Sequence, residues 1–90
     1  MKIVKKVKVK NKMGLHTRPA TAIVKLLQNT RSKVEFTYKR ETVNAKSILS
    51  ILMLAAKKNS NITITCDGED AGVTVDQLVA AFDNEFGEAS

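Results

Sequence analysis

The chemistry that this chain can perform centres on one histidine. His16 is the only histidine among 90 residues, and it stands in the segment GLHTRPA at residues 14–20, with Arg18 and Pro19 close behind it. Proline is favoured in the first turn of a helix, so we expect a helix to begin just after His16. Free backbone N–H groups and the helix dipole attract anions at such a position. A phosphate group fits this site.

An imidazole beside a guanidinium suits phosphoryl transfer. The positive field of the helix start disfavours the imidazolium form, so we expect the His16 ring to be neutral and nucleophilic near neutral pH. A neutral ring nitrogen can attack phosphorus, and Arg18 can pair with two phosphoryl oxygens. The alternative for a lone histidine is an ordinary surface residue that weakly caps the helix. The neighbouring Arg18 and Pro19 favour the phosphate interpretation.

Length and composition limit the class of protein. With 43% hydrophobic residues, we expect residues 1–90 to form one domain with a modest core. No apolar run approaches the length of a membrane span, and lysines interrupt the apolar residues of segment 1–10, so we expect neither membrane insertion nor a signal-peptide core. The single cysteine, Cys66, cannot form an internal disulfide and is expected to pack rather than react. These features predict a reducing, cytoplasmic setting.

The charge is distributed unevenly along the chain. Residues 1–46 carry 13 Lys or Arg against two acids, a net +11, whereas residues 47–90 carry two lysines against seven acids, a net −5; the sum is the formal charge of +6. A basic half indicates a negatively charged partner or substrate. The mixed signs and the scarcity of aromatic residues for base stacking argue against a nucleic-acid binder.

Residue patterning predicts four strands and three helices. Alternation of apolar and polar residues predicts strands around Val7 and Val9, at 34–38, at 41–44 and at 62–66. The apolar face of the first expected helix comprises Ala20, Ile23, Val24 and Leu27. The last helix has its apolar face at Val75, Leu78, Val79, Phe82 and Phe86, with residues 74–77 as a capping box.

The middle helix differs from the other two. Ser47 is a good N-cap, and residues 48–54 are apolar except for Ser50, so we expect most of this helix to be core. The element order is then β-α-β-β-α-β-α. We predict an α+β fold, an open two-layer sandwich in which three helices cover one face of a four-stranded antiparallel sheet.

Two segments resemble the signatures of a known family. Residues 14–20 (GLHTRPA) look like the phosphohistidine signature, and residues 43–49 (VNAKSIL) like the regulatory-serine signature, of HPr, the histidine-containing phosphocarrier family of the bacterial phosphoenolpyruvate-dependent sugar phosphotransferase system. Residues 62–70 are also similar, and the resemblance covers nearly the whole chain. It implies a monomeric carrier in sugar transport rather than an independent turnover enzyme, with no cofactor, metal or nucleic acid.

The resemblance also implies the direction of transfer. Phospho-Enzyme I is expected to pass its phosphoryl group to Nδ1 of His16, and His16 to pass it to a histidine of an EIIA domain. Arg18 is expected to hold the phosphate. The partner-binding residues implied are Thr17, Thr21 and Lys25 around the first helix and Leu49 and Leu52 on the second.

Ser47 has two interpretations. On its own it is a helix N-cap; the resemblance makes it a site of ATP-dependent regulatory phosphorylation by an HPr serine kinase/phosphorylase, with a transcriptional regulator as a further partner. A phosphate is tolerated at an N-cap because of the helix dipole, so the fold should survive. Its charge would repel an acidic partner that docks beside it.

Three departures from the usual pattern of the family concern turns and one helix position. Lys39 and Arg40 replace the usual Asn-Gly between the second and third strands and fit a type I′ turn poorly. Asn59 is expected to take the left-handed conformation in a segment that has no glycine. Ser50 stands where glycine is common, which bears on docking of a serine kinase.

Two alternative functions remain open at this point. The chain could serve mainly as a regulatory interaction protein, controlled by phosphorylation of Ser47, with sugar transport as a minor role. It could also be a small basic nucleic-acid binder, which would bind less tightly as salt rises.

Overall fold

The computed structural model describes residues 1–88, and their element order is the predicted β-α-β-β-α-β-α. The strands are β1 (Lys2–Lys8), β2 (Lys33–Tyr38), β3 (Glu41–Asn44) and β4 (Asn61–Asp67). The helices are α1 (Thr17–Leu26), α2 (Ile48–Met53) and α3 (Ala71–Asp83), followed by a short 3-10 helix, η1 (Glu85–Gly87). In this described part, no helix has the length and apolar character to cross a membrane.

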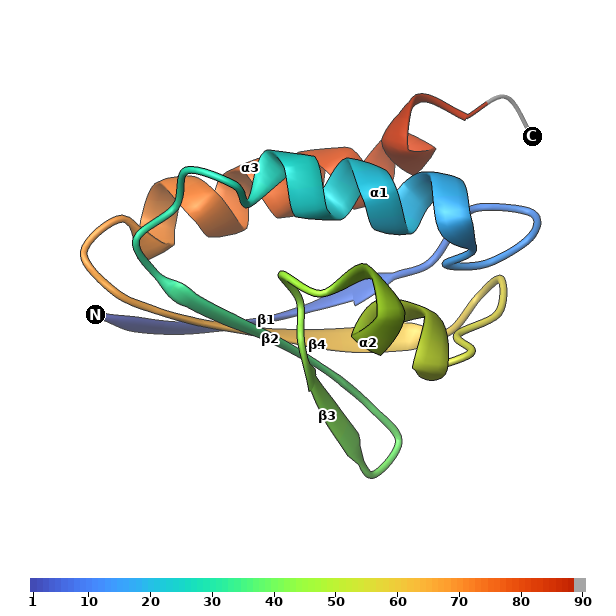
Figure 1. Cartoon of the computed structure of the whole chain (residues 1–90), viewed down its shortest axis with the longest axis horizontal. Helices are drawn as coiled ribbons and strands as arrows, with labels where there is room; N and C mark the ends of the chain where they lie inside the picture. The colour runs from blue at the N-terminus through green and yellow to red at the C-terminus, as the bar shows by residue number, and fades with distance from the viewer. Residues whose placement is uncertain (89–90) are drawn as a thin grey trace.

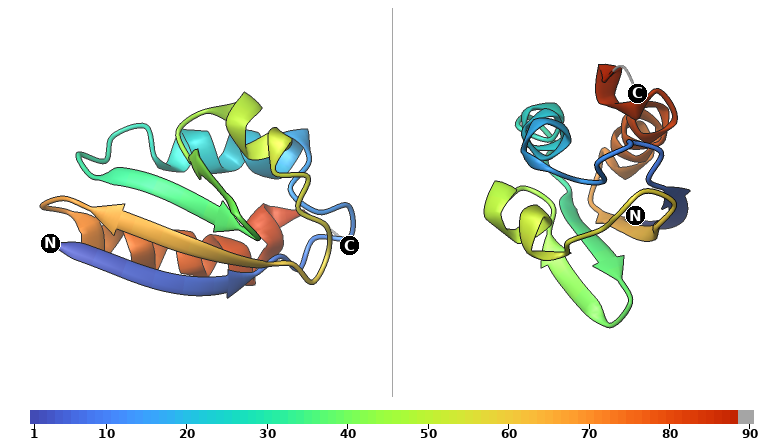
Figure 2. Two further views of the ribbon diagram at one scale, coloured as in Figure 1. Left: turned by 90° about the horizontal axis from the view of Figure 1, so that it is seen from below. Right: turned by 90° about the vertical axis from the view of Figure 1, so that its right-hand side faces the viewer.

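The elements form two layers (Figures 1 and 2). The strands lie in the order β1-β4-β2-β3, and every neighbouring pair is antiparallel. Helices α1 and α3 run side by side over one face of the sheet, and α2 lies on the same side near β3. The opposite face of the sheet is uncovered in the described structure. The predicted open sandwich, with three helices on one face, is confirmed.

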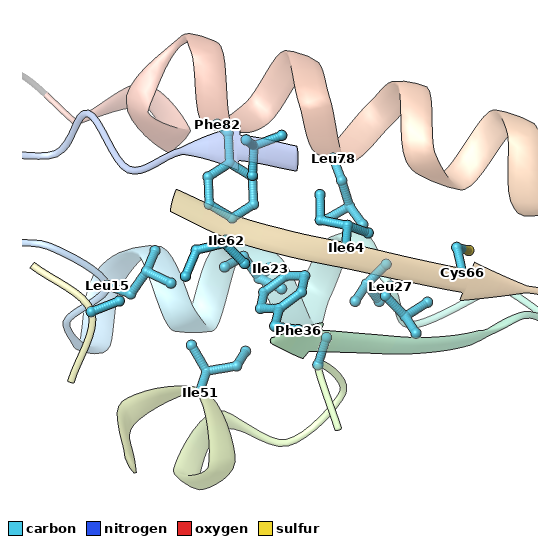
Figure 3. Close-up of a cluster of buried hydrophobic side chains, with 14 of the residues drawn as sticks. Leu15, Ile23, Leu27, Phe36, Ile51, Ile62, Ile64, Cys66, Leu78 and Phe82 are labelled. Carbon is cyan, nitrogen blue, oxygen red and sulfur yellow. The ribbon is translucent and has the colours of Figure 1, made fainter. Parts of the chain in front are cut away.

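The alternating pattern of the central strand explains how the layers join. In β4, Ile62, Ile64 and Cys66 are buried, while the threonines between them are half-buried on the other face. Phe36 of β2 meets Phe82 of α3 in an edge-to-face contact, with ring centroids 5.8 Å apart (Figure 3). Burial also raises the pKa of the Cys66 thiol, since the thiolate would lose its hydration. The thiol therefore packs, as predicted.

The apolar middle helix is less buried than predicted. Of residues 48–54, only Ile51 and Leu54 are buried, and Leu52 is half-buried. Ile48, Leu49 and Met53 are exposed, at 37%, 68% and 74%. The expectation that most of this helix is core was wrong. The helix has six residues and packs against α1 and β3 near the edge of the sheet, so only one side of it is covered.

The start and end of α3 also differ from the prediction. The helix begins at Ala71, after the N-cap Asp70, so the predicted capping box at residues 74–77 was wrong. Thr74 instead lies buried within the helix, and its hydroxyl is 2.7 Å from that of Thr30. The helix ends at Asp83, and Phe86 belongs to η1, although its ring still packs on Phe82.

The turns follow the predictions more closely. Tyr38 pairs with Glu41, so Lys39 and Arg40 form a two-residue hairpin turn. Only Lys39 has a positive φ, of 56°, whereas a type I′ turn needs positive φ at both positions. Asn59 adopts the expected left-handed conformation, with φ of 74°.

We expect Asp70 to make stability depend on acid pH. Its carboxylate accepts hydrogen bonds from Ser32, from the backbone N–H of Arg31 and from Thr30, which lower its pKa from 3.8 to about 2. This contribution is present above about pH 4 and is lost as pH falls through about 2. Thermal unfolding of Asp70→Asn should show a lower Tm than wild type at pH 7, and a gap that closes towards pH 2. Asp76→Asn, at an exposed position on α3, is the control and should follow wild type; a constant gap for Asp70→Asn would contradict the assignment.

A second prediction concerns Gly14, which has φ of 71° in the turn before α1. A Cβ there would lie 2.2 Å from the carbonyl oxygen of Ala56, whereas one on Gly87, with φ of 78°, would meet nothing within 4 Å. Gly87→Ala should therefore cost only the left-handed conformation, about 1–2 kcal/mol. Gly14→Ala should cost roughly 1–3 kcal/mol more because the backbone must move. Urea unfolding measures both, and equal losses would refute the steric argument.

Candidate functional site

His16 occupies the N-cap of α1, and its side chain does not cap the helix. The backbone there is extended, with φ −81° and ψ −168°, and the His16 carbonyl accepts the N–H of Ala20 at 3.0 Å. The imidazole makes no capping hydrogen bond, and its side chain is 30% exposed. The interpretation of His16 as a weak capping residue is therefore not supported, and the ring is available for other chemistry.

The first turn of α1 presents positive charge and free donors. It contains no acidic residue, and both Thr17 and Arg18 are exposed. Their backbone N–H groups lie where a helix has no internal acceptors, while Pro19, which has no N–H, is buried in the same turn. This end of the helix is suited to hold an anion next to His16.

The predicted residues of α1 gather around the histidine. His16, Thr17, Arg18, Thr21 and Lys25 line one open depression of about 860 Å³, together with Met13, Ala22 and Glu88. The Thr21 hydroxyl donates to the carbonyl of Thr17 at 2.8 Å. In residues 1–88, no group of three or more His, Cys, Asp or Glu side chains is arranged to bind a metal.

Sequence reasoning missed Glu88. Its carboxylate oxygens lie 2.8 and 3.0 Å from Nε2 of His16, across 72 positions of sequence. Partial desolvation opposes ionisation of this carboxyl, but hydrogen bonds from Asn11 and His16 and the charge of Arg18 outweigh it and lower the pKa of Glu88. No local sequence motif predicts a contact between residues so far apart in the chain. An ionised carboxylate can only accept a hydrogen bond, so Nε2 of His16 is the donor in this contact.

The second predicted site lies at the start of α2. Ser47 is its N-cap, as predicted, and its Oγ accepts a hydrogen bond from the backbone N–H of Ser50 at 3.2 Å. The exposed Leu49 and the half-buried Leu52 follow on the same helix. Helix α2, which carries these apolar residues, packs against α1, the helix whose N-cap is His16.

Comparison with known proteins gives a consistent result. A family model described as "PTS HPr component phosphorylation site" matches residues 3–84. A phosphocarrier protein HPr of Chlamydia muridarum is 42% identical over 80 residues, covering 89% of this chain and 77% of the relative. A crystal structure of HPr from Bacillus anthracis has 38% identity and a TM-score of 0.83, covering 88% of this chain and 94% of that one.

A second solved structure, HPr-C-His from Thermoanaerobacter tengcongensis, extends the similarity to almost the full length. It is 30% identical, has a TM-score of 0.92, and covers 98% of this chain and 99% of that one. The signatures at residues 14–20 and 43–49, the order of the elements and these matches all agree. The chain belongs to the HPr family of phosphocarrier proteins of the phosphotransferase system.

Proposed function

We propose that this chain accepts a phosphoryl group from phospho-Enzyme I on Nδ1 of His16 and donates it to a histidine of an EIIA domain. The observation that carries the proposal is an imidazole at the N-cap of α1 that makes no capping bond, next to the exposed Arg18. The role is that of a cytoplasmic carrier formed by residues 1–90 and not of a turnover enzyme.

The transfer needs little from the carrier beyond position and charge. The Nδ1 lone pair of His16 forms a bond to phosphorus while the bond between phosphorus and the donor nitrogen breaks, and that electron pair returns to the donor. The phosphoryl oxygens then face the N–H groups of the first turn of α1 and the guanidinium of Arg18. The reverse exchange with the acceptor histidine completes the relay.

The surface around His16 is suited to docking another protein. Leu49 of α2 is 68% exposed and Leu52 is half-buried beside it. Thr17, Thr21 and Lys25 border His16 on α1. An exposed apolar patch with a polar and basic border is typical of a protein-binding surface. We therefore assign Enzyme I and EIIA to this face, with Lys25 and Arg18 attracting an acidic partner.

Labelling with phosphoenolpyruvate and Enzyme I tests the relay. Wild type should gain an acid-labile, alkali-stable phosphate, and His16→Ala should gain none. Arg18→Ala should be labelled roughly tenfold to a hundredfold more slowly, because one charged partner of the phosphate is gone. Arg31→Ala removes an arginine that is paired with Glu69 at 3.8 Å, and it serves as the matched control. Wild type that stays unlabelled would overturn the proposal.

A regulatory role for Ser47 is a second proposal, supported by its place at an N-cap next to the exposed Leu49. A serine kinase would add its phosphate there, and a transcriptional regulator is the further partner proposed for the phosphorylated form. Aspartate and asparagine are both good N-caps, so Ser47→Asp and Ser47→Asn should both fold. The two variants differ in charge alone.

Binding of Enzyme I, measured by calorimetry, should therefore separate these two variants. Ser47→Asp should weaken binding several-fold through repulsion of an acidic partner, and Ser47→Asn should bind like wild type. Equal affinity of the two variants would refute the electrostatic mechanism. If Ser47→Asp altered the affinity for a regulator far more than His16→Ala did, the mainly regulatory alternative would be favoured.

A further inference from the structure

The last described segment of the chain takes an unusual path beside the start of α1 (Figures 1 and 2). Glu85, Phe86 and Gly87 have successive φ values of 58°, 55° and 78°. The left-handed conformation costs a residue other than glycine about 1–2 kcal/mol, and two such residues occur here in succession. This path persists only because contacts with the rest of the molecule compensate for it.

Asn11 and Phe82 make these contacts, and together they place the Glu88 carboxylate beside His16. The Asn11 side chain, 1% exposed, donates from Nδ2 to the carbonyl of Glu85 at 2.9 Å and to the carboxylate of Glu88. Both partners are acceptors, so the amide NH₂ must face them. Phe86 packs edge-to-face on Phe82, with centroids 4.9 Å apart. These contacts hold the Glu88 side chain, which is 14% exposed, against the ring of His16.

The remaining contact defines the state of the imidazole. Nε2 of His16 lies within hydrogen-bond distance of both Glu88 oxygens, and an ionised carboxylate can only accept. Nε2 must therefore carry the proton, and in the neutral ring Nδ1 keeps its lone pair. We infer that Glu88 is a positioning residue that fixes His16 in the tautomer whose Nδ1 is the nucleophile. This inference rests on the proposed phosphoryl relay.

The same contact acts during the transfer itself. As the Nδ1 lone pair bonds to phosphorus, the ring gains positive charge while Nε2 keeps its proton. The electron pair of the breaking bond leaves with the donor nitrogen. Glu88 stays ionised and accepts the stronger hydrogen bond from the charged ring, as a buried carboxylate does behind other catalytic histidines. Its effect passes through the ring and requires no contact with the phosphate.

Three variants of the full-length chain test this inference. Glu88→Ala removes both the acceptor and the charge, whereas Glu88→Gln keeps an oxygen acceptor and removes the charge. Glu69→Ala is the control for the loss of one negative charge, because Glu69 belongs to the turn between β4 and α3, which lies at the opposite end of the molecule from the start of α1 (Figure 1). The tautomer is read from ¹⁵N and ¹H NMR of the unphosphorylated imidazole at a pH where the ring is uncharged. Phosphorylation rates are then measured with Enzyme I.

Glu88→Ala should show a mixture of the two ring tautomers and be phosphorylated about tenfold more slowly, equivalent to ~1.4 kcal/mol in activation free energy. Glu88→Gln should keep the Nε2–H tautomer and lose less rate, and Glu69→Ala should match wild type. Wild-type tautomer in Glu88→Ala overturns the inference whatever the rate, and so does an altered tautomer at an unchanged rate. The NMR measurement needs no phosphorylation, so an unlabelled wild type would refute the relay separately.

Discussion

The functional end of this molecule depends on a backbone contact between two loops. The N–H of Leu15 donates to the carbonyl of Ala56 at 2.9 Å, directly before the N-cap of α1. The two loops lie so close together that a Cβ at position 14 would collide with the carbonyl of Ala56 unless the backbone moved. Leu15 itself is buried in the core, so the residue before His16 is held both by its side chain and by its backbone. The backbone that leads into the N-cap His16 is therefore fixed in place by this contact.

The sheet and helices supply the rigidity behind this contact. The edge-to-face packing of Phe36 on Phe82 joins β2 to α3, and Ile23 of α1 is fully buried in the same core (Figure 3). Because α1 is anchored along its length, its first turn can remain exposed without fraying. Core packing therefore holds the body of α1, while the N-terminus of that helix stays accessible to a ligand.

The parts of the site that could be predicted are those set by local sequence. His16 and Ser47 are N-caps because of the residues around them, and periodicity together with Pro19 located α1. Alternation located β2, β3 and β4, but of the first strand only its end, since β1 runs from Lys2 to Lys8 and Val9 lies outside it. The errors share another cause. The exposure of Met53 depends on how much of α2 the neighbouring elements cover, and the start of α3 depends on Asp70 binding residues 30–32. Glu88 reaches His16 across 72 positions, through a tail whose left-handed path no pattern indicates.

The balance of charge around His16 fits a group that must be received and then given away. In the proposed relay, the N-terminus of α1 and the guanidinium of Arg18 attract the phosphoryl group, and the first turn of α1 contains no acidic residue that would repel it. Glu88 adds a negative charge on the opposite side of the ring, which opposes the negative phosphate while it stabilises the positive ring. A site with only the cations would favour the phosphorylated state strongly and release it slowly. Under the proposed relay, the carboxylate would stabilise the charged ring during transfer and weaken the hold on the bound phosphate, which is the energetic requirement for a carrier.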